Sequence, residues 1–435
     1  MILNKLHLEN FRCYESLDLD FNEKLTVLVG KNGSGKTSIL DAISIALGSL
    51  FLKIDGITTK SIHESDAYYK VFDTDDLYDS IESQYPVAIT SSGVIDGKPI
   101  NWTREVSYKG GNTKYGKARS IATISKSFQD RIRKGDETLI LPLVAYYGTG
   151  RLWDNHKEKK YTVDFTSRTE GYIDCLDGSA NIKLMERWLQ KMSFDKYQRQ
   201  EAKLTLRPFL DVVLNAISKS IEGVSGMHDV HVMTELNNQD YITVVYTDEN
   251  GLRRKMPISN MSAGYKNTMS LIADIAYRLS VLNPQLGERV LESPGIVLID
   301  EIDLHLHPQW QYRILNDLTT IFPNIQFIVS THAPSVINSV KKENIAILDA
   351  RDVFSLSHEV YGREAGAIMN EIMDVPDRPN EIAEGIERIN TLIDQKEYTE
   401  AKKLLDEIDA LTGYVDADIQ VLQNKIYLLD KLRRP

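Results

Sequence analysis

The sequence predicts an α/β fold in which a parallel sheet is followed by a helical C-terminal segment. Three observations lead to this expectation. A buried strand at Leu25–Val29 passes through a glycine-rich loop into a helix at Lys36–Leu47. Two later apolar strands, Gly295–Ile299 and Ile325–His332, lead into acidic and imidazole side chains. Beyond Asp377 apolar residues recur only at helical spacing.

The loop after the first strand has the phosphate-binding pattern G-x-x-x-x-G-K-[ST]. Its glycines let backbone N–H groups surround a triphosphate, Lys36 would neutralise the β and γ phosphates, and the Thr37 hydroxyl would ligate Mg²⁺. A glycine-rich turn with no ligand is the alternative, and the strand before and helix after it favour the phosphate loop. The expected cofactors are ATP and Mg²⁺, and the expected nucleotide-binding residues are Asn32, Gly33, Ser34, Gly35, Lys36, Thr37 and Ser38.

The strand Gly295–Ile299 leads directly into Asp300 and Glu301. A buried parallel strand delivers such side chains to the edge of its sheet. We expect Asp300 to hold Mg²⁺ through water and Glu301 to polarise the attacking water as a catalytic base. An ordinary surface acid pair is the alternative.

The strand that begins at Ile325 ends in His332. An imidazole at the carboxyl end of a strand can hydrogen-bond the γ-phosphate and report its presence. A structural histidine is the more common role of an isolated imidazole. A third strand beside the other two would bring His332 into the same pocket, so we expect it to be catalytic.

A short segment, Asn260–Lys266, precedes a helix expected to begin near Asn267 and resembles a degenerate signature sequence of ABC ATPases. Ser262 and Gly264 are retained, whereas Ala263 replaces a glycine. In that family the serine and glycine contact the γ-phosphate held by the other subunit, with a helix N-terminus facing the anion. The resemblance implies that catalysis needs two copies of the chain. A plain helix N-cap is the alternative.

The order of these motifs resembles the SMC/RecF/OLD branch of ABC ATPases. Leu6–Arg12 followed by Leu17–Phe21 alternates as a β-hairpin and is similar to the N-terminal sheet of that branch, which implies a nucleotide-binding role for Arg12. The segment with Asp303, His305 and His307 stands where that branch has a loop between subunits. Closely spaced imidazoles and a carboxylate can also bind metal, and the resemblance favours the dimer loop.

Within this branch, Tyr146–Arg151, Tyr361–Glu364 and Met373–Pro379 resemble the PtuA family, the ATPase subunits of Septu anti-phage systems that also occur beside certain retrons. The resemblance implies a homodimer or higher oligomer that acts as a sensor or regulatory subunit. It implies an HNH-type, PtuB-like nuclease partner and, in a retron, a reverse transcriptase with its DNA. The fold implied is a RecF/SMC-like head.

The composition has 62 acidic and 51 basic residues, a formal net charge of −11, which repels nucleic acid on average. No apolar run approaches the roughly 18 residues of a membrane span, so no membrane partner is expected. With Cys13 and Cys175 alone, a disulfide framework is excluded. A cytoplasmic protein is the expectation.

Charge is unevenly distributed. The segment from Asp55 to Tyr85 is acidic, whereas Lys109–Lys134 is basic and interleaved with Tyr108 and Tyr115. Mobile basic loops neutralise phosphates without reading sequence, which makes Lys109–Lys134 a candidate nucleic-acid contact. A solvated face, or a contact with the acidic segment of a neighbouring subunit, is the alternative.

Four regions are expected: an N-terminal ATPase part at 1–150, a compact helical and β lobe at 151–260, the rest of the ATPase at 261–376 and a helical docking segment at 377–435. Glu186–Ile221 predicts one or two helices without the sustained heptads of an SMC coiled coil. Asp416 and Asp418 have the spacing of a nuclease acid pair, but their position before a helix favours N-capping. A self-sufficient OLD-like nuclease would need a further domain. A RecF-type DNA-repair ATPase is another function that the motifs allow. The nucleotide-binding subunit of a transporter is disfavoured by the degenerate signature and the long helical tail.

Overall fold

The computed structural model describes residues 1–72, 80–152, 167–178, 182–204, 207–222, 226–235, 242–373, 378–413 and 417–433. The chain separates into two compact units, Met1–Gly362 and Arg363–Pro435. Parts of the sequence segments discussed above lie outside the described residues, among them 73–79 of the acidic segment, 205–206 of the predicted helical stretch, 374–377 and Asp416.

The core of the first unit is a six-stranded sheet in the order β15 (Asp352–Phe354), β14 (Ile345–Asp349), β3 (Leu25–Val29), β13 (Ile325–Thr331), β12 (Gly295–Ile299) and β8 (Leu143–Tyr147). Every pair is parallel except β14 with β15. The three strands predicted from sequence are confirmed, and they lie side by side. Strands β3, β12 and β13 are buried throughout, as expected for a parallel sheet covered on both faces.

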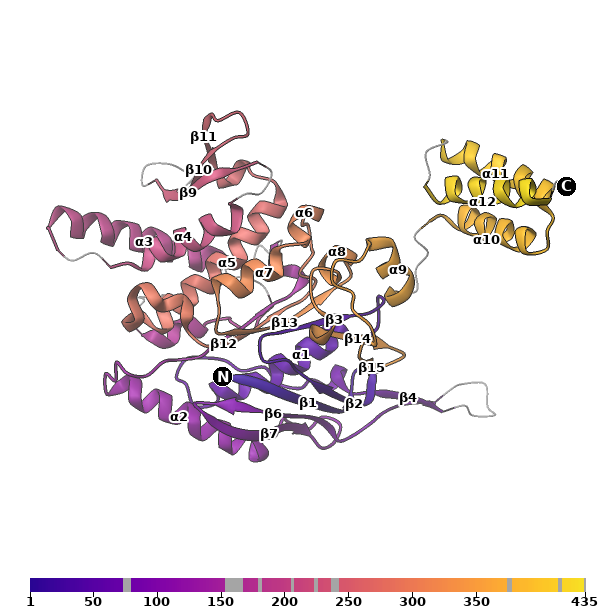
Figure 1. Ribbon diagram of the computed structural model, residues 1–435. Coiled ribbons are helices and arrows are strands. Elements are labelled where there is room, and N and C mark those ends of the chain that lie inside the picture. The colour runs from indigo at the N-terminus through magenta and orange to yellow at the C-terminus, as the bar shows by residue number, and fades with distance from the viewer. Residues whose placement is uncertain are drawn as a thin grey trace. The chain divides into compact units, whose positions relative to one another are not determined.

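A second, antiparallel sheet has the order β2 (Tyr14–Asp20), β1 (Ile2–Phe11), β6 (Val87–Ile95) and β7 (Lys98–Val106). The predicted N-terminal hairpin is therefore confirmed. Helix α1 (Lys36–Leu47) lies between the two sheets (Figure 1). The Trp102 indole donates to the Ala46 carbonyl at 2.9 Å, and the Gln326 side chain bonds both the N–H and the carbonyl of Leu3, so polar contacts join the layers.

The basic segment, treated above as a mobile basic loop, is largely a helix, α2 (Arg119–Arg133). Ile121, Ser125 and Phe128 recur at helical spacing and are buried, which fixes the helix on the antiparallel sheet side. Several of its cations form ion pairs within the chain: Lys109 with Glu64, Lys114 and Lys117 with Glu105, Arg131 with Asp136 and Arg133 with Asp55. These carboxylates offset part of the positive charge.

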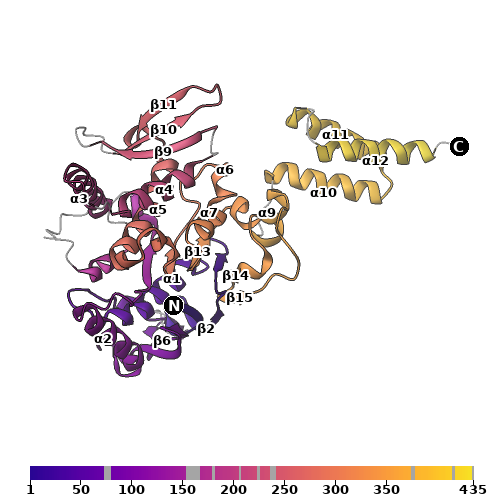
Figure 2. The ribbon, with the colours of Figure 1, turned by 60° about the vertical axis from the view of Figure 1, so that its left-hand side comes forward.

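The remaining lobe of this unit combines helices with a small sheet (Figure 2). Helices α3 (Ile182–Glu201) and α4 (Phe209–Ile221) confirm the predicted helical stretch. The sheet consists of β9 (His228–Thr234), β10 (Ile242–Thr247) and β11 (Arg253–Pro257), with β10 in the middle. The sequence did not indicate β11, because its charged residues are exposed at a sheet edge. Helix α5 (Ala263–Leu282) begins four residues before the expected Asn267.

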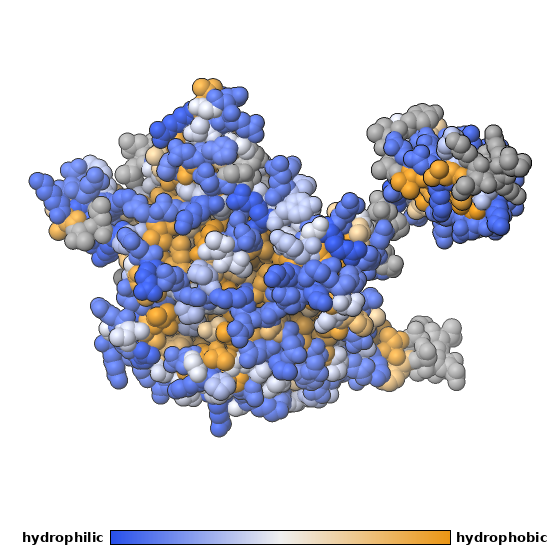
Figure 3. Space-filling view, in the orientation of Figure 1, coloured by the Kyte–Doolittle hydropathy of each residue, from blue (hydrophilic) through white to orange (hydrophobic). Residues whose placement is uncertain are grey.

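The second unit contains α9 (Ala365–Met373), α10 (Asn380–Asp394), α11 (Tyr398–Thr412) and α12 (Ala417–Arg433). The helical character predicted beyond Asp377 is confirmed, as α10, α11 and α12. They form a shared core of Ile389, Ile393, Ala401, Leu405, Ile408, Ile419, Leu422 and Ile426. The inner apolar faces of these helices therefore cover one another. Hydrophobic side chains still reach the surface of this unit (Figure 3), among them Leu411, Val421, Tyr427 and Leu428.

No helix in the described ranges combines the length and apolar character that crossing a membrane requires.

Candidate nucleotide site

The carboxyl ends of β3, β13 and β12 converge on one cavity of about 300 Å³. Parallel strands present their carboxyl ends at one edge of a sheet, so loops far apart in sequence meet there. The cavity is lined by Arg12, Cys13, Asn32, Gly33, Gly35, Lys36, Thr37, Ser38, Asp300, Glu301 and His332. These include all the predicted nucleotide-binding and catalytic residues except Ser34. No sequence pattern indicated that Cys13 would lie here.

The glycine-rich loop adopts a conformation that requires glycine. Gly33 and Gly35 have φ angles of 82° and 95°, which side-chain-bearing residues rarely adopt. A Cβ at Gly35 would also overlap the Tyr14 hydroxyl, which donates to the Ser34 carbonyl at 2.9 Å. The hydroxyl Oγ of Ser34 is buried and without a hydrogen-bond partner among the described residues. The loop is held in place from the N-terminal sheet.

Lys36 is nearly buried, at 5% exposure, and its ammonium group donates to the carbonyls of Gly30 and Lys31 at 2.8 and 3.0 Å. Burial lowers the pKa of Lys36, and the nearby carboxylates of Asp300 and Glu301 oppose that shift. Its positive charge thus lies at the cavity, where a phosphate group would compensate it.

The two residues predicted to hold Mg²⁺ are in direct contact. The Thr37 hydroxyl donates to Asp300 Oδ2 at 2.8 Å, and the Ser330 hydroxyl donates to Asp300 Oδ1 at 2.5 Å. Asp300 is 1% exposed. A hydroxyl and a buried carboxylate are oxygen donors of the kind that Mg²⁺ prefers, so these residues fit the ion. Ser330 is a supporting residue that the sequence reasoning missed, although it lies in the strand singled out for His332.

Glu301 follows Asp300 in a turn with φ of 47°, an unusual value for a residue with a side chain. Its N–H donates to the Ser330 hydroxyl at 2.8 Å, so the same serine holds both acids. Backbone strain of this kind clusters at functional sites, and it persists only where surrounding contacts hold it. Glu301 lines the cavity together with Asp300.

His332 lies just beyond β13 and is held through its backbone. The Thr331 hydroxyl donates to Asp303 Oδ1 at 2.5 Å, and the His332 N–H donates to the same oxygen at 3.4 Å. Burial, followed by the positive charge of Lys36, lowers the pKa of His332. The imidazole is therefore neutral at physiological pH and can donate or accept a hydrogen bond.

Ser262 and Ala263 lie exposed at the N-terminus of α5, and neither lines the cavity of its own chain. Gly264 is buried, and a Cβ there would lie 2.7 Å from the carbonyl oxygen of His305. The Asn267 amide also donates to the Leu304 carbonyl at 2.8 Å. The signature segment and the proposed dimer loop therefore pack against each other.

The three residues of the proposed dimer loop have different surroundings. Asp303 accepts the hydrogen bonds from Thr331 and His332 described above. His305 is exposed and has a φ angle of 63°. The His307 ring accepts a hydrogen bond from the Gln309 N–H at 3.4 Å, at the start of α6 (Pro308–Gln311). In the part of the chain that the structure describes, no three His, Cys, Asp or Glu side chains form a group able to hold a metal ion.

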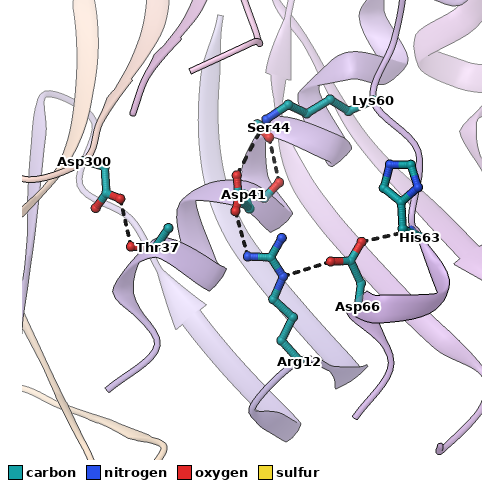
Figure 4. A network of polar contacts seen from close by, with 8 residues as sticks. All are labelled: Arg12, Thr37, Asp41, Ser44, Lys60, His63, Asp66 and Asp300. Atoms are coloured by element: carbon teal, nitrogen blue, oxygen red, sulfur yellow. Dashed lines mark hydrogen bonds and ion pairs between the residues drawn. The ribbon is translucent and has the colours of Figure 1, made fainter. Parts of the chain in front are cut away.

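Arg12 reaches the rim of the cavity from the end of β1 and is bound by two carboxylates (Figure 4). Its Nε donates to Asp66 Oδ1 at 2.9 Å, and its Nη1 donates to Asp41 Oδ2 at 2.7 Å. Burial by itself would lower the pKa of Arg12, but the two carboxylates outweigh it and raise the pKa of the guanidinium. The sequence reasoning singled out neither Asp41 nor Asp66 as a site residue.

Comparison with known proteins assigns the family. The family described as "AAA domain" matches residues 5–222, and that described as "AAA ATPase domain" matches residues 214–337. The chain is 29% identical to the Retron Ec83 probable ATPase of Escherichia coli, covering 86% of this chain and 77% of that protein. It is 23% identical to Septu protein PtuA of Bacillus thuringiensis, covering 94% and 90%. The OLD nuclease of Thermus scotoductus is 23% identical, covering 77% of this chain and 59% of that protein. The expected resemblance to PtuA and retron ATPases is confirmed.

Proposed function

Because the chain belongs to the AAA-domain family, we propose that it binds ATP with Mg²⁺ in the cavity at the end of the parallel sheet and hydrolyses it there. The observation that carries the proposal is the convergence of Lys36, Thr37, Asp300, Glu301 and His332 on one cavity. Thr37 and Asp300 would hold the ion, which when bound screens the phosphate charge. Glu301 accepts a proton from the attacking water, and neutral His332 offers a hydrogen bond to the terminal phosphate.

We further propose that the active form is a homodimer or higher oligomer in which Ser262, Ala263 and Gly264 of one copy complete the site of the other. Ser262 is exposed at the N-terminus of a long helix, and its side chain makes no capping bond. Such a terminus favours an anion. Asp303, His305 and His307 lie in the loop against this segment, where we propose that they contact the second subunit.

A mixing experiment tests the shared site. Ser262→Arg and Lys36→Ala chains are each expected to be nearly inactive alone, and an equimolar mixture should regain part of the ATPase activity. One of the two sites in a mixed dimer keeps both of its halves intact. The measurement is phosphate release, with mixed dimers verified by differently tagged chains. If verified mixed dimers show no recovery, nucleotide is not shared between subunits.

The biological role we propose is a cytoplasmic sensor or regulatory subunit in an anti-phage complex whose destructive chemistry lies in another chain. Support comes from the likeness to Septu PtuA and to a retron ATPase over most of the chain. The partner proposed is an HNH-type, PtuB-like nuclease, joined in a retron setting by a reverse transcriptase and its DNA. Coexpression with the proteins encoded by neighbouring genes is the direct test.

Two further candidate functions are distinguished by experiment. A RecF/SMC-like DNA-maintenance ATPase would use the same site, and the identity of the neighbouring genes separates it from a defence ATPase. An OLD-like nuclease is favoured by the partial likeness to that protein, and cleavage of DNA by the chain alone would identify it. The basic segment Lys109–Lys134 stays a proposed nucleic-acid contact. Its exposed cations Arg119, Lys126 and Lys134 are the ones to substitute in a DNA-binding assay.

Removal of the C-terminal helices is expected to separate assembly from nucleotide binding. A chain ending at Asp377 should keep ATP affinity, because every residue lining the cavity lies before it, and should lose association with its partner or with a second subunit. Exposed Leu411, Val421, Tyr427 and Leu428 are the apolar contacts removed. Complex formation, melting temperature and nucleotide binding are compared with those of the full chain. Retention of the complex would contradict a docking role.

The intact chain alone is expected to hydrolyse ATP and to leave DNA uncut. A cleavage assay with Mg²⁺ or Mn²⁺ and purified protein checks this, with the coexpressed complex as the comparison. Robust cutting by the isolated chain would contradict the proposed division of labour.

A further inference from the structure

The backbone on both sides of Phe11, at Asn10 and at Arg12, is held by hydrogen bonds to one distant segment. Asn10 and Arg12 have φ angles of 51° and 52°, so the chain makes a tight left-handed turn about Phe11 at the end of β1. The Arg12 N–H donates to the Asp66 carbonyl at 2.7 Å, and the Tyr68 N–H donates to the Asn10 carbonyl at 2.9 Å. Two conformations that side-chain-bearing residues seldom adopt are thus maintained by contacts with one distant segment.

The same segment holds the Arg12 side chain through a buried carboxylate. Asp66 is only 4% exposed, and its two oxygens have separate tasks. Oδ1 accepts from Arg12 Nε at 2.9 Å, and Oδ2 accepts from the His63 N–H at 2.9 Å. A carboxylate this deeply buried requires a cation beside it, and Arg12 is that cation.

Asp41 holds the other end of the guanidinium. It lies on α1, one turn beyond Thr37, and accepts from Arg12 Nη1 at 2.7 Å. Lys60 lies 3.6 Å from its second oxygen, with its ammonium 4.6 Å from the centre of the Tyr146 ring. The two cations, Arg12 and Lys60, balance the charge of the two carboxylates within the cluster.

This arrangement leaves one amino group of the guanidinium, Nη2, available to another partner. The bonds to the carboxylates use Nε and Nη1, and within the described ranges Nη2 has no hydrogen-bond partner. Arg12 lines the cavity together with Lys36 and Ser38. A guanidinium already bonded through Nε and Nη1 loses little conformational freedom when a ligand bonds to Nη2. Its planar donors suit phosphate oxygens.

We propose that Asp41 and Asp66 are positioning residues that hold Arg12 so that its Nη2 group donates to a phosphate of the bound nucleotide. The inference rests on the proposed nucleotide site and extends it to two acids that touch no phosphate themselves. The carboxylates increase nucleotide affinity despite their negative charge, because they act through Arg12.

The test is a double-mutant cycle with mant-ATP, a fluorescent ATP analogue, and Mg²⁺. Asp66→Asn is expected to raise its dissociation constant about tenfold, which corresponds to one well-placed charged hydrogen bond. Arg12→Ala should raise it at least as much. In the Arg12→Ala background the Asp66→Asn change should add nothing, because the group that Asp66 positions is absent.

Glu64→Gln is the matched control, since it removes the same charge in the same short segment and Glu64 pairs with Lys109 instead of Arg12. It should bind mant-ATP as the wild type does. Effects of Asp66→Asn that multiply with those of Arg12→Ala would overturn the proposal, as would unchanged or tighter binding by Asp66→Asn. Absence of binding by the wild-type chain would instead contradict the proposed nucleotide site itself.

Folding is monitored in parallel. Arg12→Ala leaves Asp66 buried without its cation and should lower the melting temperature more than the Arg12→Ala/Asp66→Asn double variant. Asp41→Asn provides a second cycle from a different element, in case the Asp66 variants fold poorly. A tenfold loss of affinity that disappears in the Arg12→Ala background is expected there as well. Independent effects in this second cycle would also overturn the proposal.

Discussion

Glu301→Gln is expected to bind ATP with nearly wild-type affinity and to hydrolyse it about 10²- to 10⁴-fold more slowly, the range over which a positioned general base contributes. Glutamine preserves the shape and the backbone bond from the Glu301 N–H to Ser330, and it cannot accept the proton of the attacking water. Phosphate release under saturating ATP and mant-ATP binding measure the two steps separately.

Glu288→Gln serves as the control for this change, because Glu288 is exposed and lies outside the cavity. Its hydrolysis rate should match that of the wild type. Near-normal hydrolysis by Glu301→Gln would show that another group activates water. Loss of ATP binding would show that Glu301 contributes to binding the nucleotide and not only to its hydrolysis.

Lys36→Ala is expected to weaken ATP binding by about 100-fold or more, since the proposed charged donor to two phosphates is lost. The predicted loss has a second source. The ammonium also donates to the carbonyls of Gly30 and Lys31, so its removal loosens the loop that surrounds the phosphates. Isothermal titration with ATP and Mg²⁺ gives the affinity.

Lys53→Ala is a suitable control, because Lys53 is an exposed lysine outside the cavity. Melting temperatures of both variants separate loss of the site from loss of the fold. Retained tight binding by Lys36→Ala would contradict the proposed phosphate contact and, with it, the orientation of nucleotide in the cavity.

The local structure around this cavity could be predicted from sequence because each motif is short and has its own geometric demand. Glycine at positions 33 and 35 is required by the backbone of the loop, and Thr37 must follow Lys36 at the helix start. Asp300 and His332 follow runs of apolar residues that only a buried strand accommodates. These dependences span few residues, so sequence spacing is enough to show them.

Features that depend on charge or on sheet edges were harder to predict. Helix α2 was not recognised from sequence, because the basic residues on its exposed face conceal the apolar spacing of Ile121 and Phe128. Strand β11 is charged because it lies at an edge. The C-terminal helices were predicted correctly, but their shared core depends on the packing of three helices.

By itself the sequence determined the glycine-rich loop, the acidic strand, the histidine strand and the order in which they occur. Only the tertiary structure decided that β3, β13 and β12 are neighbours, and that Ser330 holds both acids. It alone joined Arg12 to Asp41 and Asp66, residues that are 29 and 54 positions away. The reason is physical: a strand's burial is recorded in its own residues, whereas a contact between distant side chains exists only after the sheet has brought their loops to one edge.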